Sequence, residues 1–382
     1  MVIAVATLVE VAQRAGVSPA TASRILSGSD KPVSERLRAQ VLAAAQALQY
    51  VPNAHAQQLA RARPTAVGVV VHDVSDPYFA EITRGLQRVA TDAGRLLFIC
   101  NSYRDPAKER EYVALLHSHR TAAIVLAGSG HHDPTATSAV AAQLRHYQRS
   151  GGRVTVIGRH GRHPGDAVLP ANEEGGYLAG AELYRLGHQR VGVIAGPRPL
   201  TTTTDRLAGL RRAARDHHRG VSPRRVAYAD FDRDSGAAAA AALLDADPGL
   251  TALAVLNDTM AIGALAVTRE RGLAVPGRLS VIGFDDMPIA RDLTPALTTV
   301  RLPLTEIGAT AMRLALEPPV EGPPRTARAE RFARARGAGA VDAMGTAGTA
   351  EPDEGRYGGG EPRVVEVPAE LVRRASTAPP PP

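Results

Sequence analysis

Histidine pairs are the first residues of this sequence that suggest chemistry, because imidazole nitrogens bind metals and transfer protons. Adjacent histidines stand at 131–132 and at 217–218, and His160 lies close to His163. Neighbouring side chains on a helix point apart, and no cysteine or carboxylate spacing completes a ligand set around any of these pairs. We therefore expect no metal site and no cofactor.

Motifs for catalysis and phosphate binding are also missing. No serine lies in a G-x-S-x-G turn, which presents the nucleophile of many hydrolases. No G-x-G-x-x-G follows the first apolar run, and the lone Gly-Ser-Gly at 128–130 is too short to indicate a dinucleotide loop. We therefore expect a binding protein rather than an enzyme.

A stretch near the start, "VSPATASRIL" at 17–26, combines small residues with one long cation. Ser18 is a candidate N-cap, and Pro19 suits the first position of a helix. Small exposed side chains would let this helix end approach a DNA duplex, where an alanine methyl can contact a thymine methyl. Arg24 could bind guanine through two hydrogen bonds or pair with a phosphate.

Three predicted helices position this stretch. Thr7 and Glu10 form a capping box before the first helix, Gly16 ends it, and Ser34 caps the third. The first two helices and their turn make a helix-turn-helix candidate at 7–28, whose second helix would enter the major groove. A generic three-helix core is the alternative interpretation.

Charge and composition narrow the class of protein. The 382 residues carry a net charge of +7, and residues 1–65 alone carry +4, which favours a polyanionic partner for that end. A single cysteine excludes a disulfide framework. No apolar run is long enough to span a membrane and no signal peptide is visible, so we expect a cytoplasmic protein without a membrane partner.

From Val67 onward, short apolar runs alternate with helical patterns. This alternation is typical of parallel sheets that helices cover on both faces. Eight such repeats suit two doubly wound halves better than one, with a ligand between the halves at the carboxyl ends of the strands. One of the runs, "RLLFIC", predicts a buried strand that contains Cys100.

Two segments fall outside these patterns. Residues 52–65 hold a short helical pattern, "NAHAQQLARA", which has few apolar residues and would be marginal alone. Residues 318–361 include 23 Gly, Ala and Pro among 44 and lack periodicity, so we expect a disordered insertion, with a transient basic helix as the alternative. Strand-like order resumes at "PRVVEVPAELVRRAS".

The sequence resembles the LacI (lactose and galactose repressor) family of transcriptional regulators. "TLVEVAQRAGVSPATASRILSG" and "VSERLRAQVLAAAQALQYVPNAHAQQLA" are similar to the family's DNA-binding headpiece. "VGVVVHDVSDPYF", "ELYRLGHQRVGVIAGP", "VLNDTMAIGAL" and "LSVIGFDDMPIARDLTPALTTVRLP" are similar to blocks of its ligand-binding core. Only residues 318–361 lack a counterpart.

The resemblance implies a fold and a division into domains. An N-terminal all-α helix-turn-helix headpiece would occupy 1–51, and a hinge helix and linker would occupy 52–65. An α/β bilobed core, similar to periplasmic binding proteins and built on two doubly wound parallel sheets, would occupy 66–317 with 362–377. This core would bind the effector and dimerise, and residues 318–361 would interrupt it.

The resemblance also implies which residues contact DNA. In the family a hinge leucine enters the minor groove and kinks the operator. That position is Leu59 here, and a plain linker with a surface leucine is the alternative. The expected DNA-binding residues are Thr7, Ser18, Pro19, Ala20, Thr21, Ser23, Arg24, Asn53, Ala56 and Leu59.

An effector cleft is implied in the same way, with aromatic rings to stack on a sugar and polar groups to hold its hydroxyls. Two departures leave the ligand undetermined: Asp76 stands where the family usually has Asn, and Ala171 stands where an Asp commonly precedes Asn172. The expected effector-binding residues are Tyr78, Phe79, Thr202, Thr204, Arg206, Phe231, Asn257 and Asp285.

The implied function is that of a homodimeric transcriptional repressor. It would bind palindromic double-stranded operator DNA, and a small molecule, a sugar or related metabolite, would change its affinity for that DNA allosterically. The alternative is a bilobed small-molecule binding protein or an enzyme without operator binding. No C-terminal heptad run is visible, so we do not expect a zipper-built tetramer.

Overall fold

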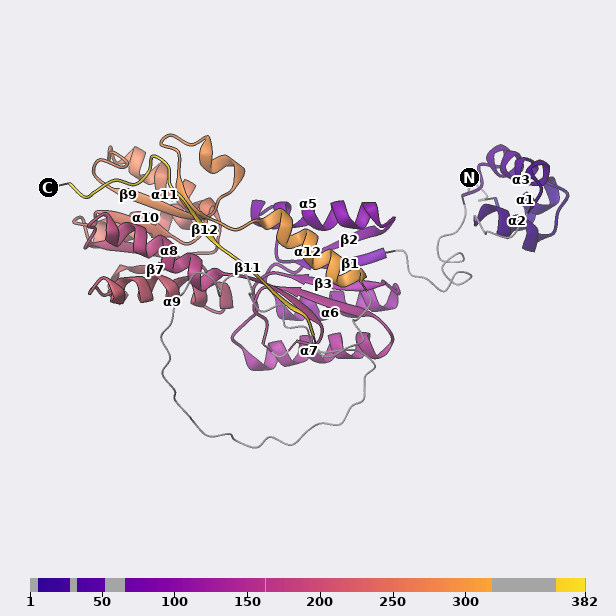
Figure 1. Ribbon diagram of the computed structural model, residues 1–382, viewed down its shortest axis with the longest axis horizontal. Helices are drawn as coiled ribbons and strands as arrows, with labels where there is room; N and C mark the ends of the chain where they lie inside the picture. The colour runs from indigo at the N-terminus through magenta and orange to yellow at the C-terminus, as the bar shows by residue number, and fades with distance from the viewer. Residues whose placement is uncertain (1–5, 28–32, 52–65, 162, 318–361, 382) are drawn as a thin grey trace, which may run out of the picture. The chain divides into compact units, whose positions relative to one another are not determined.

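The computed structural model describes residues 6–27, 33–51, 66–161, 163–317 and 362–381. The chain divides into two compact units, Met1–Thr65 and Ala66–Pro382 (Figure 1). Each unit has its own hydrophobic core. The predicted hinge residues Asn53, Ala56 and Leu59 lie outside the described residues, as does the predicted insertion at 318–361.

The described residues of the first unit form three helices, α1 (Leu8–Arg14), α2 (Pro19–Leu26) and α3 (Glu35–Ala47). Thr7, Ser18 and Ser34 cap them as predicted, and each side chain accepts a hydrogen bond from a backbone N–H of its own helix. Gly16, with a φ of +66°, takes the left-handed conformation that follows a helix end. The buried core consists of Val11, Ala12, Ala22, Ile25, Val41, Ala44 and Ala45.

The second unit contains two six-stranded sheets, which define an N-terminal and a C-terminal subdomain. The N-terminal sheet has the spatial order β11 (Val364–Val367), β5 (Asp166–Pro170), β4 (Arg153–Ile157), β3 (Ala123–Ala127), β1 (Ala66–Val71), β2 (Leu96–Asn101). The C-terminal sheet has the order β12 (Glu370–Val372), β10 (Thr298–Arg301), β9 (Ser280–Asp285), β8 (Ala252–Val255), β6 (Val191–Ala195), β7 (Val226–Tyr228).

Helices cover both faces of each sheet (Figure 1). The N-terminal sheet packs between the pair α5 (Pro77–Asp92) and α12 (Leu304–Leu316) and the pair α6 (Pro106–Ser118) and α7 (Pro134–Arg149). The C-terminal sheet packs between α8 (Asn172–Arg185) with α9 (Thr201–Asp216) and α10 (Arg233–Ala246) with α11 (Asp258–Glu270). Short 3₁₀ helices lie at Pro223–Arg225 and Pro288–Arg291.

The prediction of two doubly wound sheets is confirmed, with one exception. β12 pairs antiparallel to β10, whereas every other strand pair is parallel. β11 runs toward the edge where the two sheets face each other, and the chain continues through residues 368 and 369 straight into β12. β12 therefore runs away from that edge, opposite to its one neighbour β10. The short strands β5 and β10 are not among the eight predicted.

Strand β2 differs from its predicted burial. Leu96 is 64% exposed, Phe98 41% and Ile99 43%, and Cys100 is only half-buried. The prediction of a buried strand is wrong here because β2 is the edge of its sheet, with one neighbour instead of two. An edge strand with exposed apolar side chains invites pairing or covering by another chain.

Candidate functional site

The carboxyl ends of strands from both subdomains meet around one cavity with a free space of about 330 Å³, part of it open to solvent. This is within the range of small-molecule sites, which lie at this edge in open α/β sheets. Of the predicted effector residues, all but Thr204 line it. The lining residues are His72, Asp76, Tyr78, Phe79, Arg104, Ser129, Thr202, Arg206, Phe231, Asn257 and Asp285.

Arg206 is the buried centre of this cavity, with only 2% of its surface exposed. Its guanidinium donates to the side-chain oxygen of Asn172 over 2.9 Å, to the carbonyl of Leu256 over 2.7 Å, and to Oδ1 of Asp285 over 2.8 Å. It also lies over the ring of Phe284, 3.8 Å from the centroid. Three of its five N–H groups are thereby used, and the remainder can serve a ligand.

Two glycines allow the helices to position Arg206. A Cβ on Gly176 of α8 would lie 1.9 Å from the carbonyl oxygen of Arg206, and one on Gly209 of α9 would lie 1.8 Å from that of Glu173. The backbones of α8 and α9 therefore touch where they cross. This close crossing brings Asn172, at the first position of α8, to the guanidinium.

Asp285 ends β9 in an unusual backbone conformation. Its φ is +109°, and that of Asp286 is +54°, in the region that favours glycine. Such strain is characteristic of functional sites, where the surrounding structure enforces it. Burial raises the pKa of the Asp285 carboxyl to about 6, although the charge of Arg206 acts in the opposite direction. The side-chain amide of Asn257 donates to the second oxygen over 3.4 Å.

A neighbouring carboxyl, Asp258, is fully buried behind this site. It accepts hydrogen bonds from the Thr299 hydroxyl over 2.6 Å and from the backbone N–H of Met287 over 2.7 Å. Burial, together with the adjacent charge of Asp285, raises the pKa of Asp258 to about 8. The folded protein therefore holds a proton there at neutral pH.

This proton makes the stability of the fold depend on pH. In the unfolded chain the Asp258 carboxyl loses its proton near pH 3.8, whereas the folded protein keeps it up to about pH 8. Between these two pH values the unfolded state therefore binds fewer protons than the folded state. The contribution of Asp258 to the free energy of unfolding consequently falls as pH rises. Asp258→Asn should remove up to ~1.4 kcal/mol per pH unit of this fall. Urea denaturation of the unaltered and Asp258→Asn proteins at pH 6, 7 and 8 measures this difference. If the free energy of unfolding changes with pH equally in both proteins, the prediction is contradicted.

Aromatic side chains form the opposite wall of the cavity. Tyr78 and Phe79, at the start of α5, pack edge to face with centroids 5.0 Å apart. Asp76 caps this helix by accepting from the Tyr78 N–H over 3.0 Å, and burial raises the pKa of its carboxyl. From the other subdomain, Phe231 faces the guanidinium of Arg104 at 5.7 Å. The rings and cations thus come from both sides of the cavity.

Hydrogen bonds join the two subdomains beside the cavity. The Ser129 hydroxyl donates to that of Thr202 over 2.5 Å, and the Thr201 N–H donates to the Gly130 carbonyl over 2.9 Å. Arg159 pairs with Asp205 through two hydrogen bonds, of 3.1 and 2.5 Å. The exposed Thr204 bonds to His132 over 2.7 Å instead of facing the cavity. These contacts join the two subdomains directly beside the cavity.

Four lining residues were not in the predicted effector set: Asp76, which the sequence marks only as a departure from the family pattern, and three that sequence reasoning missed altogether, His72, Arg104 and Ser129. Each follows a predicted strand, so the rule that placed Asn257 and Asp285 at the cavity would have found them too. The structure also shows that Arg104 has a backbone φ of +61°, which is rare for a non-glycine residue and which the sequence does not reveal. Within the described ranges, no group of three or more His, Cys, Asp or Glu residues could hold a metal ion.

The candidate DNA interface lies on α2 of the first unit. Ser18, Pro19, Ala20 and Arg24 are exposed, whereas Thr21 and Ser23 are partly buried. The Ser18 hydroxyl accepts from the Thr21 N–H over 3.1 Å. The helix end therefore presents small side chains to solvent with Arg24 one turn further along. Thr7 is exposed at the start of α1, but its hydroxyl is bound to Glu10 within the capping box.

Comparison with known proteins decides the family. Residues 7–53 match the family described as "Bacterial regulatory proteins, lacI family", and residues 181–336 match the "Periplasmic binding protein-like domain". The chain is 36% identical to the HTH-type transcriptional regulator GalR of Salmonella typhimurium over 320 residues, which are 81% of this chain and 89% of that protein. The chain belongs to the lacI family. It is a DNA-binding transcriptional regulator, as GalR is, and not an enzyme.

A second relative and two solved structures are also similar to this chain. The chain is 32% identical to the HTH-type transcriptional repressor PurR of Klebsiella pneumoniae over 82% of this chain and 90% of that protein. A CelR–cellobiose complex is 27% identical over 97% of this chain and 99% of that one, with a TM-score of 0.64. A lac repressor dimer bound to operator and the anti-inducer ONPF shares the fold, with 24% identity, coverage of 98% and 99%, and a TM-score of 0.75. Among the described residues, no helix is long and apolar enough to cross a membrane.

Proposed function

We propose that this lacI-family regulator is a cytoplasmic, homodimeric repressor whose operator affinity changes when a sugar or related polyhydroxylated metabolite binds in the cleft. The observation that carries the proposal is the buried Arg206–Asp285 pair in a cavity that both subdomains line. A carboxylate, an amide and a guanidinium can each make two hydrogen bonds to neighbouring hydroxyls. The rings of Tyr78 and Phe231 supply apolar faces for a sugar ring.

The cleft also suggests how ligand binding is transmitted. Ligand contacts to Tyr78 and Asp285 come from different subdomains, so a ligand that binds both favours the closed arrangement. DNA and ligand then each bind one arrangement of the subdomains better, and each changes the affinity for the other by the same factor. A thermal-shift screen of the full chain, starting with sugars and nucleosides, identifies the ligand class. Stabilisation by nucleosides alone would contradict the sugar assignment.

For the operator, we infer that α2 supplies the base contacts and that Leu59 kinks the DNA. Pro19 and Ala20 allow close approach, and Thr7, Ser18, Thr21 and Ser23 contact phosphates or bases at the groove edge. Asn53, Ala56 and Leu59 of the hinge enter the minor groove under this proposal, which rests on the family resemblance.

Arg24→Ala should weaken binding to the operator by roughly 5- to 150-fold, since a good bidentate contact to guanine contributes about 1–3 kcal/mol of discrimination. Arg14→Ala, also exposed but in the last turn of α1, is the matched control and should change affinity far less. Fluorescence anisotropy with a palindromic duplex selected from a random library measures both. Equal affinity of the Arg24→Ala and unaltered proteins would contradict the assignment.

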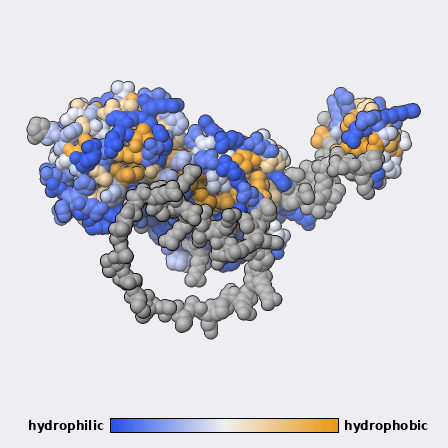
Figure 2. Space-filling view, in the orientation of Figure 1, coloured by the Kyte–Doolittle hydropathy of each residue, from blue (hydrophilic) through white to orange (hydrophobic). Residues whose placement is uncertain are grey.

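A dimer interface is proposed on the edge of the N-terminal subdomain. Leu96, Phe98 and Ile99 of β2 and the nearby Tyr103 are all exposed, with Tyr103 at 59%. Figure 2 shows hydrophobic surface over the part of the N-terminal subdomain where β2 and α12 lie in Figure 1. A palindromic site needs two headpieces, and a second copy would cover these side chains. Sedimentation that gives only the mass of one chain at micromolar concentration would contradict the dimer.

A further inference from the structure

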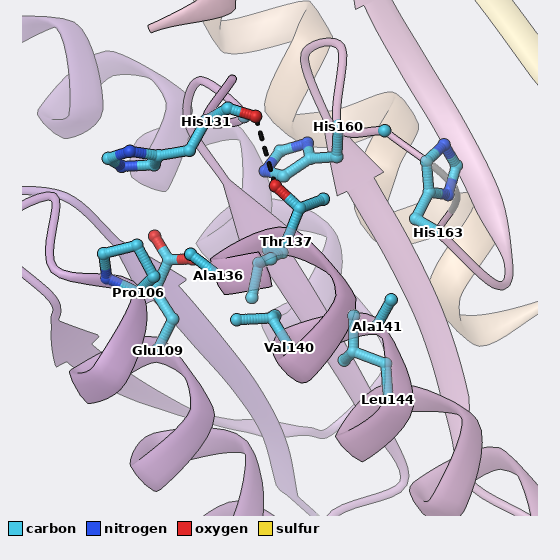
Figure 3. Close-up of a pocket in the computed structure, with 13 residues that line it drawn as sticks. Pro106, Glu109, His131, Ala136, Thr137, Val140, Ala141, Leu144, His160 and His163 are labelled. Atoms are coloured by element: carbon cyan, nitrogen blue, oxygen red, sulfur yellow. Dashed lines mark hydrogen bonds between the residues drawn. The ribbon is translucent and has the colours of Figure 1, made fainter. Parts of the chain in front are cut away.

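A second cavity lies entirely within the N-terminal subdomain, separate from the cleft. It has a free space of about 400 Å³, part of it open to solvent, between α6, α7, the end of β3 and residues 160, 161 and 163 after β4 (Figure 3). Its floor is apolar and consists of Leu126, Val140, Ala141 and Leu144. Nothing in the proposed function uses this space.

Polar groups face the space from two sides. Glu109 of α6 projects toward it from one side, and His160 lies across from it, beyond Thr137 of α7 (Figure 3). Nδ1 of His160 lies 3.3 Å from the Gly158 carbonyl, which places the proton on Nδ1 and leaves Nε2 as an acceptor. Burial lowers the pKa of His160 to about 4, so the ring is neutral. Nε2 of His131 is buried without a hydrogen-bond partner in the described part of the chain.

The chemistry of these groups selects a type of ligand. Glu109 is only 6% exposed, and one of its oxygens lies 3.5 Å from His72 Nε2 and 3.4 Å from the Ser102 hydroxyl. The Glu109 carboxylate repels an anion, and the free Nε2 of the neutral His160 ring can only accept, so both favour a hydroxyl that donates to them. An apolar floor favours a ring or short hydrocarbon over a polyhydroxylated body. The cleft and this cavity therefore suit different molecules.

The walls of this cavity also make the contact between the subdomains. Gly130 accepts from Thr201 of α9, His131 pairs with Leu200 in an isolated bridge, and the carbonyl of Arg159, next to His160, accepts from the Thr201 hydroxyl over 2.8 Å. On its other side, the cavity shares the His72–Glu109 pair with the cleft, since His72 lines the cleft and Glu109 lines this cavity. An occupant would therefore fix the loops on which closure depends.

We propose that this cavity is a second ligand site, which takes a small uncharged molecule with an apolar ring and a hydroxyl group. Its occupancy stabilises the closed arrangement and so raises affinity for the cleft ligand. The binding is independent of the proposed function, whereas the effect on the cleft ligand rests on it.

The test uses 4-fluorophenol as the probe and ¹⁹F NMR of the full chain as the readout. Saturable binding is expected for 4-fluorophenol, and at least tenfold weaker binding for the anion 4-fluorobenzoate. Ala136→Leu, whose added side chain enters the cavity, should weaken 4-fluorophenol binding at least tenfold. Ala142→Leu makes the same change at an exposed position of α7 and should leave binding unchanged. Glu109→Gln, which keeps the shape of the side chain, should weaken binding severalfold.

Three results would overturn this site: no saturable binding, equal binding by the Ala136→Leu protein, or equal affinity for 4-fluorobenzoate. If 4-fluorophenol binds as expected but the affinity for the cleft ligand does not rise in its presence, the coupling is wrong and the site stands. If no cleft ligand is found at all, the proposed function fails while the NMR result still decides the second site.

Discussion

Deletion of residues 1–65 is expected to abolish binding to the palindromic duplex and to leave ligand binding in the cleft intact. The first unit has its own core and carries over half of the chain's net charge of +7. Specific binding typically exceeds non-specific binding by at least about a thousandfold, so the loss should reach that size or more. Anisotropy at several salt concentrations measures it, because phosphate contacts make binding of the full chain strongly salt-dependent.

Ligand binding by the shortened chain is the control for this deletion, because it shows that the second unit is still folded. Residues 66–382 form a compact unit, so the cleft ligand should raise its melting temperature as it does in the full chain. Duplex binding by residues 66–382 that equals that of the full chain would show that the first unit is not the DNA-binding part.

Arg206→Met is expected to have the largest effect on the second unit. It leaves the Asp285 carboxylate, the Asn172 side-chain oxygen and the Leu256 carbonyl without their donor in a buried site. Removing one partner of a buried ion pair typically costs about 3–5 kcal/mol, and ligand binding should be lost as well. Urea denaturation and the thermal-shift assay measure the two effects.

Two further variants separate stability from binding. Arg211→Met changes an exposed arginine on the same helix and should alter neither quantity. Combining Arg206→Met with Asp285→Asn removes the unpaired charge, so it should recover part of the stability but none of the ligand binding. An Arg206→Met protein that still binds the ligand with unchanged affinity would exclude Arg206 from the site.

The headpiece could be predicted from sequence almost completely, because its determinants are local. Thr7 with Glu10, Ser18 before Pro19, and Gly16 each act within a few residues, and each takes its predicted place. The cleft could be predicted as a set of strand ends, since parallel strands end at one edge. Thr204 does not line the cavity, because side chains two positions apart on α9 point in different directions, and it bonds to His132 instead.

What could not be predicted depends on contacts between distant segments. The three acceptors of Arg206 come from α8, from the end of β8 and from β9, and no local pattern connects them. The exposure of β2 follows from its edge position, which the apolar run "RLLFIC" does not reveal. The second cavity likewise requires α6 and α7 to lie side by side, and the spacing of Glu109 and His160 gives no sign of it.

The most direct test of ligand-controlled DNA binding measures both affinities of the full chain. Duplex affinity is determined at increasing concentrations of the ligand found by thermal shift, and ligand affinity is determined with and without saturating duplex. Linkage predicts that ligand changes duplex affinity by some 5- to 150-fold and that duplex changes ligand affinity by the same factor. A ligand that binds in the cleft while the duplex affinity stays constant would contradict the account.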